Sequence, residues 1–484
     1  MRKLNPLFWA IAASSAILFL CSSVRHTLLQ SSAWDLGIFD QAVYLISSGT
    51  PPISSFLGFH ILGDHAAWVF YLLALLYKIY PDVHWLLAVQ ATALALGGVP
   101  TWYLARQAGL TQRQASAIAL SYLLYPLVFN INLFDFHPEV MALPAMLAAV
   151  WAARSNKNWW FCLSIILILG CRDALALNVV AMGLWLLLFE KRRFCGAIAI
   201  VAGIAWFLIA TQVIIPYFGG EAASVGRYLP RYSNFGDSFP EIAKNLLLKP
   251  NLLLGKVCSL ETVEYLGLLF LPVLWGLSPR HLAPLVGAIP TLGMNILANT
   301  HLQRDLTHQY SVPVLPFLFL AAIESLAARR GWCQSPRKIV SHSLSQAIAH
   351  LLRREWCQAP RTIILWSLLA FLALAKYGYF GSIYLNSLDT RQATQTAIAQ
   401  VKSGAVLTTA EIAPHLTHRR LVRFTDATSL PTNLAKFNYV LLNQRHPGWL
   451  SNSEFATKLV EQLKNAPEFH LSYQRDDVYL FAKQ

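Results

Sequence analysis

Charged side chains are scarce in this sequence. Only 13% of its 484 residues are Asp, Glu, Lys or Arg, whereas soluble domains carry about one quarter. In their place, 56% of the residues are hydrophobic, and the mean hydropathy is +0.46. This composition excludes an ordinary soluble protein and indicates that most of the chain lies in a lipid bilayer.

Acidic residues are fewer than basic ones, with 24 Asp and Glu against 38 Lys and Arg and a formal net charge of +14. Such an excess can indicate nucleic acid binding, but here the basic residues form short clusters between apolar runs and no single basic face. Clusters of this kind are typical of cytoplasmic loops, which are enriched in Lys and Arg. We therefore expect the lipid bilayer as a partner, and no nucleic acid.

Motifs built on cysteine or glycine are also missing. The seven cysteines show no CxxC or metal-like spacing, so we infer no disulfide framework. No P-loop-like glycine motif, internal repeat or low-complexity tract is present. The first residues, MRKLNPLFWAIAASSAILFLCSSV, have a basic start and an apolar stretch but no clean small-x-small cleavage site. This pattern predicts a retained signal-anchor with a cytoplasmic N-terminus.

Apolar runs recur along most of the chain, and a spanning helix needs about 20 mostly apolar residues. Residues 66–80 are short for a span, and leaving them out places the basic clusters on one side of the membrane. We predict a re-entrant or interfacial helix there. The chain is thus a predicted polytopic α-helical membrane protein with eleven transmembrane helices, near residues 6–23, 84–104, 115–133, 138–153, 159–171, 174–190, 194–216, 259–277, 281–298, 311–327 and 361–384.

Two domains are predicted from these runs. Residues 1–385 form a transmembrane domain, with an external loop at about 24–83 and a basic cytoplasmic loop at about 328–360. Beyond residue 385 the composition becomes that of a small soluble domain, with strand-like AVLTTA, LVRFTD and FNYVLLNQ and a helix near 453–465. With eleven spans and a cytoplasmic N-terminus, this C-terminal α/β domain (386–484) is expected to be extracytoplasmic.

Carboxylates and histidines gather in loops on the predicted external side. A single loop carboxylate is often only solvated or caps a helix. An ionisable pair between apolar stretches, in contrast, is expensive and usually functional. We predict that residues from several loops form one site on this face: Asp35, Asp40, Asp64 and His65 from the first loop, with His137, Glu139, Arg172 and Asp173 from later loops.

Basic side chains in two later external loops are candidates for holding a phosphate, namely Arg231, Arg304 and His308. Arginine suits this role because its planar donors match phosphate oxygens two at a time. Anchoring to lipid headgroups is an equally simple role for such residues. A divalent metal is a further possibility, with Asp64 and His65 as ligands, but no ligand pair has a diagnostic spacing and no cofactor is assigned.

Several sequence motifs together resemble one family. They are WDLGIFDQ followed by Gly49, LGDHAAWVF, FDFHPEV, LSPRHLAPLVGAIPTLGMNIL, HQYSVPVLPFLFLAAI and LTTAEIAPHLTHR. The chain resembles the DUF2079 family of predicted bacterial membrane proteins, whose architecture is similar to that of the GT-C glycosyltransferases. The resemblance runs from about Trp34 to Asn443.

The resemblance implies a GT-C-like fold in the cytoplasmic (inner) membrane of a bacterium. It also implies an inverting transfer of sugar from a polyprenyl-phosphate donor to an unidentified acceptor at the outer face. By its position after the first span and before Gly49, Asp35 matches the catalytic acidic residue of GT-C enzymes best, and Asp40 is the second candidate. The chain departs from the tandem acid pair of many GT-C members, because Leu36 follows Asp35.

Two other classes of function are compatible with the pattern. A transporter or flippase would use Arg172, Asp173 and the histidine-rich loops as a path, but would carry ionisable residues near the middle of spans. The acids of this chain cluster instead at one set of helix ends. A non-catalytic envelope scaffold would tolerate Asp35→Asn, whereas a transferase would not.

Overall fold

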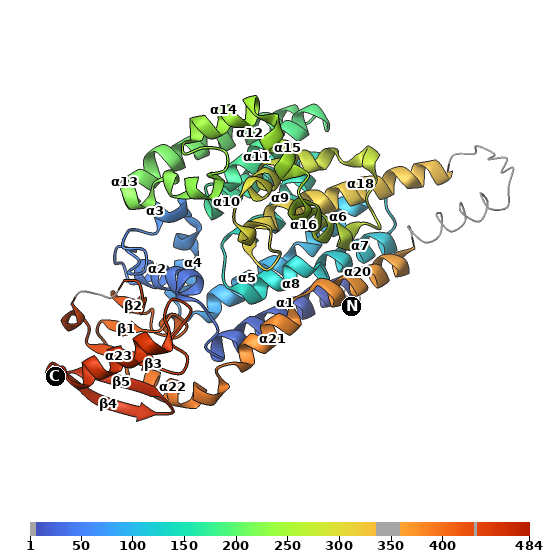
Figure 1. Cartoon of the computed structure of the whole chain (residues 1–484). Helices are drawn as coiled ribbons and strands as arrows, with labels where there is room; N and C mark the ends of the chain where they lie inside the picture. The colour runs from blue at the N-terminus through green and yellow to red at the C-terminus, as the bar shows by residue number, and fades with distance from the viewer. Residues whose placement is uncertain (1–5, 335–358, 430–432) are drawn as a thin grey trace.

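The computed structural model describes residues 6–334, 359–429 and 433–484. Long helices run side by side through most of the molecule, and a small β-sheet lies at one end of this bundle (Figure 1). Most of the predicted basic loop at 328–360, from 335 to 358, lies outside the described residues. The helical membrane fold predicted from the sequence is confirmed, and a small sheet accompanies it.

Six helical segments of the described chain are long and apolar enough to cross a bilayer: Pro6–Thr27, His84–Gln107, Gln112–Phe134, Arg193–Gly219, Gln309–Arg329 and Pro360–Leu385. Three shorter apolar helices, Asn158–Cys171, Leu175–Leu188 and Ala283–Leu297, accompany them. The other two predicted spans also contain helices, α9 (Glu139–Arg154) and α16 (Leu260–Phe270). The total of eleven spans stays a prediction.

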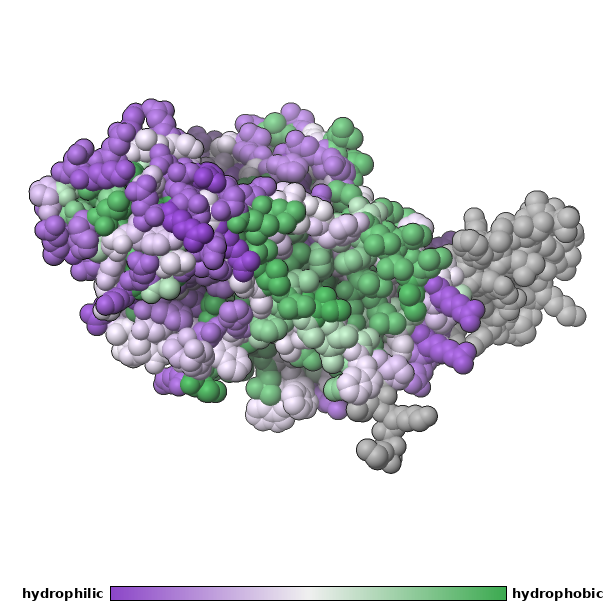
Figure 2. Space-filling view, turned by 90° about the horizontal axis from the view of Figure 1, so that it is seen from below, coloured by the Kyte–Doolittle hydropathy of each residue, from purple (hydrophilic) through white to green (hydrophobic). Residues whose placement is uncertain are grey.

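Burial separates inner helices from outer ones. In the segment Gln309–Arg329, which contains most of α18 (Leu315–Gln334), 83% of the apolar window is buried, whereas in α1 (Pro6–Thr27) the share is 17%. Figure 2 shows hydrophobic side chains in a broad zone over the helices and hydrophilic ones at the end that holds the sheet. Leu20, Val201 and Leu369 are among the exposed apolar side chains. An exposed apolar zone of this extent is typical of a surface that faces lipid.

The segment predicted not to span forms α4 (Val69–Tyr77), with nine residues. At 1.5 Å per residue such a helix is about 14 Å long, about half of the hydrocarbon thickness. It packs against α2 (Ile38–Ser47), the main helix of the loop at about 24–83. This loop is predicted to be external, and we keep the name first external loop for it.

The C-terminal part of the chain forms a five-stranded sheet in the order β2-β1-β3-β5-β4. Strand β1 is parallel to its neighbours β2 and β3, whereas β5 is antiparallel to β3 and β4. Helix α22 (Leu388–Gln400) packs on one face and α23 (Ser453–Lys464) on the other. We call residues 388–484 the C-terminal α/β unit; its strands are β1 (Val406–Thr408), β2 (Val422–Phe424), β3 (Tyr439–Asn443), β4 (Phe469–Arg475) and β5 (Val478–Lys483).

This unit is attached to the first external loop. The Ala33 N–H donates to the Ala410 carbonyl at 3.1 Å, and Ala33 is buried in the same apolar cluster as α22. The Ser55 hydroxyl donates to the Val422 carbonyl at 2.7 Å and accepts from the Val422 N–H at 3.0 Å. The first loop and the C-terminal α/β unit therefore form one continuous structure at one end of the helix bundle (Figure 1).

Candidate functional site

A cavity of about 910 Å³ lies between the first external loop and the turns that begin α9 and α11 (Leu175–Leu188). We call it the main cavity. A smaller apolar cavity of about 340 Å³ adjoins it and shares His65, Glu139, Arg172 and Arg231 with its wall. The predicted residues that line the main cavity are Asp35, Asp64, His65, His137, Glu139, Arg172, Arg231 and His308. Asp173 lines the apolar cavity.

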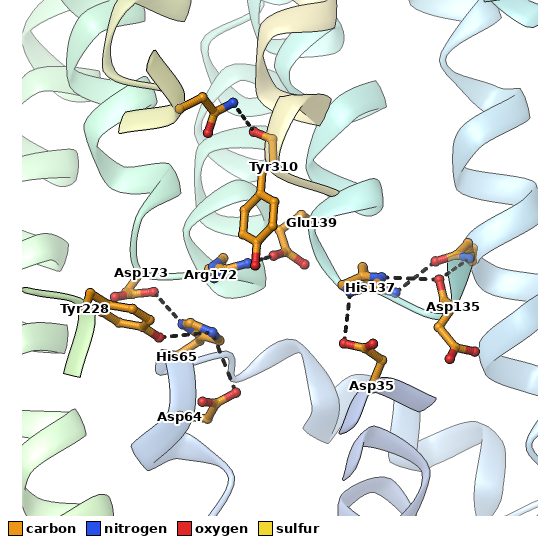
Figure 3. Close-up of polar contacts among 12 residues, drawn as sticks. Asp35, Asp64, His65, Asp135, His137, Glu139, Arg172, Asp173, Tyr228 and Tyr310 are labelled. Atoms are coloured by element: carbon orange, nitrogen blue, oxygen red, sulfur yellow. Dashed lines mark hydrogen bonds and ion pairs between the residues drawn. The ribbon is translucent and has the colours of Figure 1, made fainter. Parts of the chain in front are cut away.

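Asp35 and His137 both lie in the wall of the main cavity and face each other (Figure 3). Asp35 lies in a short π-helical turn, Ala33–Gly37, whose first residues are held by the Ser32 side chain, which accepts from the Trp34 N–H. The Asp35 Oδ1 atom is 3.3 Å from His137 Nε2. His137 Nδ1 donates to the Asp135 carbonyl at 3.2 Å, which fixes the ring. The Asp35 side chain keeps 25% of its surface exposed, against 2% for His137, so it is the carboxylate that a ligand would meet.

Electrostatics favours the charged forms of Asp35 and His137. Burial raises the pKa of Asp35. The hydrogen bond and the charge of His137 lower this pKa and outweigh burial, so the net pKa lies below the ordinary 3.8. Burial lowers the pKa of His137, but Asp35 raises it above the ordinary 6.5. Each residue thus shifts the pKa of the other toward its charged form, a carboxylate facing an imidazolium.

This pair predicts how stability depends on pH. The contribution of Asp35 to the stability of the fold is fully present above pH 3.8 and is lost as the pH falls through the lowered pKa of Asp35. The contribution of His137 to the stability of the fold is fully present below pH 6.5 and is lost as the pH rises through the raised pKa of His137. We expect the melting temperature of wild type to exceed that of His137→Gln most in the mildly acidic range. Measured in detergent, a difference that grows as the pH rises above about 7 would contradict the assignment.

A second ion pair, Arg25–Asp135, supports the turn Ala33–Gly37 through Ser32. Arg25, in the last turn of α1, lies 2.8 Å from the Asp135 carboxylate, and the other oxygen of Asp135 accepts from the Ser32 N–H at 2.8 Å. Burial is the main reason why the pKa of Asp135 rises to about 6, against the lowering by Arg25. Neither Arg25 nor Asp135 was among the site residues predicted from the sequence, although Asp135 stands in the FDFHPEV motif.

A second polar group surrounds His65 at the other end of the main cavity (Figure 3). His65 Nδ1 donates to Asp173 at 3.1 Å, and the Tyr228 hydroxyl is 3.5 Å from His65 Nε2. Arg227 binds the Asp64 carboxylate at 2.8 Å. These partners occupy the two side chains considered as metal ligands, and the described residues contain no group of three or more His, Cys, Asp or Glu that could hold a metal ion.

Two arginines line both cavities but differ in their partners. Arg172 forms an ion pair with the buried carboxylate of Glu139, whose second oxygen has no hydrogen-bond partner among the described residues. Arg231 lies over the rings of Tyr228 and Tyr310, at 4.8 and 5.8 Å. Among the described residues no carboxylate lies within ion-pair distance of Arg231. Arg231 is thus the cation whose charge is available for an anionic ligand.

Two of the predicted site residues line neither cavity. Asp40 is 1% exposed and binds Tyr77, Thr417 and His418, with 3.2 Å to the His418 ring. Its carboxylate therefore ties α2 to the C-terminal α/β unit. Arg304 binds Glu261 at 2.6 Å and the Ala298 carbonyl at 2.6 Å. The Asp40 and Arg304 side chains therefore bind other segments of the chain.

His308 lines the main cavity but is held by its own segment. Its ring packs on Phe134 at 4.3 Å, and Nδ1 lies 3.0 Å from the Thr307 hydroxyl and 3.5 Å from Asp305. The aromatic residues Tyr228 and Tyr310, which complete the wall beside Arg231, were not among the residues selected from the sequence. The sequence feature that could have identified Tyr228 and Tyr310 is their position in the same loops as Arg231 and His308.

Comparison with known proteins places this geometry in context. The model of a family described as "Predicted membrane protein (DUF2079)" matches residues 25–480. The crystal structure of ArnT from Cupriavidus metallidurans bound to undecaprenyl phosphate is similar in fold, with a TM-score of 0.56, 12% identity and coverage of 98% of this chain and 97% of ArnT. ArnT from the same organism in the apo state gives a TM-score of 0.52, 12% identity and coverage of 97% and 98%. No curated protein sequence matches the chain.

Proposed function

The chain belongs to the DUF2079 family of predicted membrane proteins, as its motifs indicated, and from this premise we propose that it is an inverting glycosyltransferase. It moves a sugar from a polyprenyl-phosphate donor to an acceptor at the outer face of the cytoplasmic membrane of a bacterium. The observation that carries the proposal is the juxtaposition of two cavities. The charged main cavity and the apolar cavity share Arg172 and Arg231, which matches a ligand with a phosphate head and a hydrocarbon tail.

In this proposal the donor lies across both cavities. The start of the prenyl chain fits the apolar cavity, which Leu175, Phe207 and Leu297 help to line. The phosphate then meets Arg231, and the sugar points into the main cavity toward Asp35. The fold shared with ArnT, which was crystallised with undecaprenyl phosphate, supports a lipid phosphate as the ligand.

Asp35 acts as the general base in this proposal. The acceptor hydroxyl oxygen attacks the anomeric carbon, its proton passes to the Asp35 carboxylate, and the bond from that carbon to the phosphate oxygen breaks with inversion. His137 positions the carboxylate, whose other oxygen accepts no hydrogen bond from the described residues. A positioned base of this kind contributes about 10²–10⁴-fold.

The leaving group is already an anion, so it needs stabilisation of charge and no proton. Arg231 supplies that charge, and Arg172, although paired with Glu139, adds to the positive potential at the junction of the cavities. The step as written requires no metal ion.

Replacing Arg231 by Gln should weaken binding of a polyprenyl phosphate about 10–100-fold, since hydrogen bonds to charged groups contribute about 1.5–3 kcal/mol. Arg231→Lys should recover part of the loss, because it keeps the charge without the planar fork. The measurement is the binding of a fluorescent polyprenyl phosphate to purified protein. Arg280→Gln, an exposed arginine outside both cavities, is the control, and an equal effect of both Gln variants would contradict the role of Arg231.

The proposed activity is tested with a panel of radiolabelled polyprenyl-phosphate sugars, supplied to the purified chain in detergent together with a membrane extract as the source of acceptor. Release of free polyprenyl phosphate and transfer of label to a new product are expected for at least one donor. A chain that binds the lipid phosphates but cleaves none of the donors would favour the alternative, a transporter or flippase of lipid-linked substrates.

A further inference from the structure

A separate cavity of about 350 Å³ lies between the C-terminal α/β unit and the residues Leu29, Gln30, Asn386 and Ser387. It is found where the parallel strands β1 and β3 end, because Thr409 directly follows β1 and Asn443 ends β3. Ligands of sheets with parallel strands commonly bind at this carboxyl edge. The volume also lies in the range of about 300–1,000 Å³ that is usual for small-molecule sites. We call it the strand-end cavity.

The floor of the strand-end cavity is polar although it is buried. Thr390 and Thr394 of α22 and the strand-end residues Thr409 and Asn443 are each at most 4% exposed. Asn443 Nδ2 donates to the Thr390 hydroxyl at 2.8 Å, and Asn443 Oδ1 accepts from the His446 N–H at 2.9 Å. These bonds fix the floor and the loop above it in one arrangement.

Glu411 brings an unsatisfied acceptor to this cavity. Its Oε1 accepts from the Trp449 N–H at 3.2 Å, whereas its Oε2 is buried and has no hydrogen-bond partner in the described part of the chain. Gly448, with φ +95°, allows the loop to pass so closely that a Cβ there would be 2.9 Å from Oε2. A buried polar atom without a partner is costly. A hydroxyl group of a ligand in the cavity would satisfy it.

The charges around the strand-end cavity argue against an anionic ligand. Arg445 binds Asp389 at 2.8 Å and Asp477 at 2.7 Å, and His446 binds Asp389 at 2.8 Å. Within the described wall of this cavity, Arg445 and His446 are therefore both already paired with carboxylates. This differs from the main cavity, where Arg231 has no carboxylate partner.

Trp449 supplies an apolar platform beside these polar groups. Its side chain is 56% exposed, and it lines both the strand-end cavity and the main cavity. A large exposed aromatic ring next to hydrogen-bonding side chains suits a ligand with an apolar face and many hydroxyls. A neutral sugar has this chemistry.

We propose that the strand-end cavity binds a neutral sugar unit of the acceptor, which stacks on Trp449 and donates a hydroxyl hydrogen bond to Glu411. Because Trp449 lines both cavities, an acceptor held here extends into the main cavity, where Asp35 lies. Naming this sugar as the acceptor rests on the proposed function, whereas binding of a neutral glycan by the C-terminal α/β unit does not.

The test uses the full chain in detergent, labelled with a fluorophore and applied to a microarray of neutral glycans. We expect wild type and Asp35→Asn to bind the same glycans, since Asp35 is outside the strand-end cavity. Trp449→Ala should bind about tenfold or more weakly, as expected for loss of an aromatic platform. Trp449→Phe should keep part of the binding. Glu411→Gln keeps an oxygen for the Trp449 N–H but should also lose affinity, and Trp159→Ala, which removes an 84% exposed tryptophan elsewhere, should not.

The outcomes separate this inference from the transferase activity. Glycan binding that is lost in Trp449→Ala, with an unchanged melting temperature, supports the site even if no variant transfers sugar. Absence of neutral-glycan binding by wild type, or equal binding by Trp449→Ala and wild type, overturns the site even if the chain is a transferase. Binding of only phosphorylated or acidic glycans also overturns it.

Discussion

Replacing Asp35 by Asn is expected to lower turnover of the active polyprenyl-phosphate sugar about 10²–10⁴-fold, which is the usual contribution of a general base. Asn has nearly the shape of Asp, so the turn Ala33–Gly37 is retained. Affinity for the lipid phosphate should change little, because the phosphate is held by Arg231 and not by Asp35. The measurement is the initial rate of label transfer at saturating donor, with lipid binding measured in the same preparation.

The matched control for this prediction is Asp82→Asn. Asp82 is a carboxylate of the same external loop, lies 2.6 Å from the His84 ring and lines neither the main nor the apolar cavity. It therefore repeats the Asp–His arrangement away from the proposed site. Equal rates for wild type and Asp35→Asn, or equal losses in Asp35→Asn and Asp82→Asn, would remove Asp35 from the chemistry.

Replacing Arg172 by Gln is expected to destabilise the protein by about 3–5 kcal/mol, as is usual when one partner of a buried ion pair is removed. Glu139 is then left as an uncompensated charge, with its side chain only 5% exposed. The measurement is the melting temperature in detergent, with retention of a monodisperse peak on size exclusion. Lipid phosphate binding should fall as well, because the potential at the junction of the cavities becomes less positive.

A double variant separates the charge pair from other effects. Glu139→Gln combined with Arg172→Gln removes both charges and should recover much of the stability that Arg172→Gln alone loses. Recovery of stability without recovery of lipid binding would assign Arg172 a role in binding beyond its pairing. If the double variant is as unstable as the sum of the two single variants, the ion pair does not explain the placement of these residues.

Membrane character and the elements of the sheet were readable from the sequence because they depend on local patterns. Apolar runs of spanning length predicted the long helices. The strand-like segments AVLTTA, LVRFTD and FNYVLLNQ correspond to β1, β2 and β3. Attachment of this sheet to the first loop was not readable, because the Ser55–Val422 hydrogen bonds join residues 367 positions apart.

Most of the residues predicted for the site line one of two adjoining cavities, whereas Asp40 and Arg304 line neither. Asp35 and Asp40 stand five residues apart, which on a regular helix is a rotation difference of about 140°, so one helix face does not hold both. Which of them meets a cavity depends on tertiary packing, and the structure turns Asp40 toward Thr417. Arg304 was selected for its charge, but its partner Glu261 precedes it by 43 positions.

The separation of sugar from lipid distinguishes the proposed transferase most directly from a transporter. A donor that carries one radioisotope in the sugar and another in the prenyl chain is incorporated with the purified protein into sealed proteoliposomes, and acceptor extract is supplied on the side of the main cavity. The account predicts that the two labels separate, with the sugar label in a new product and the prenyl label in free polyprenyl phosphate. Labels that stay together while the intact donor crosses the bilayer would contradict it.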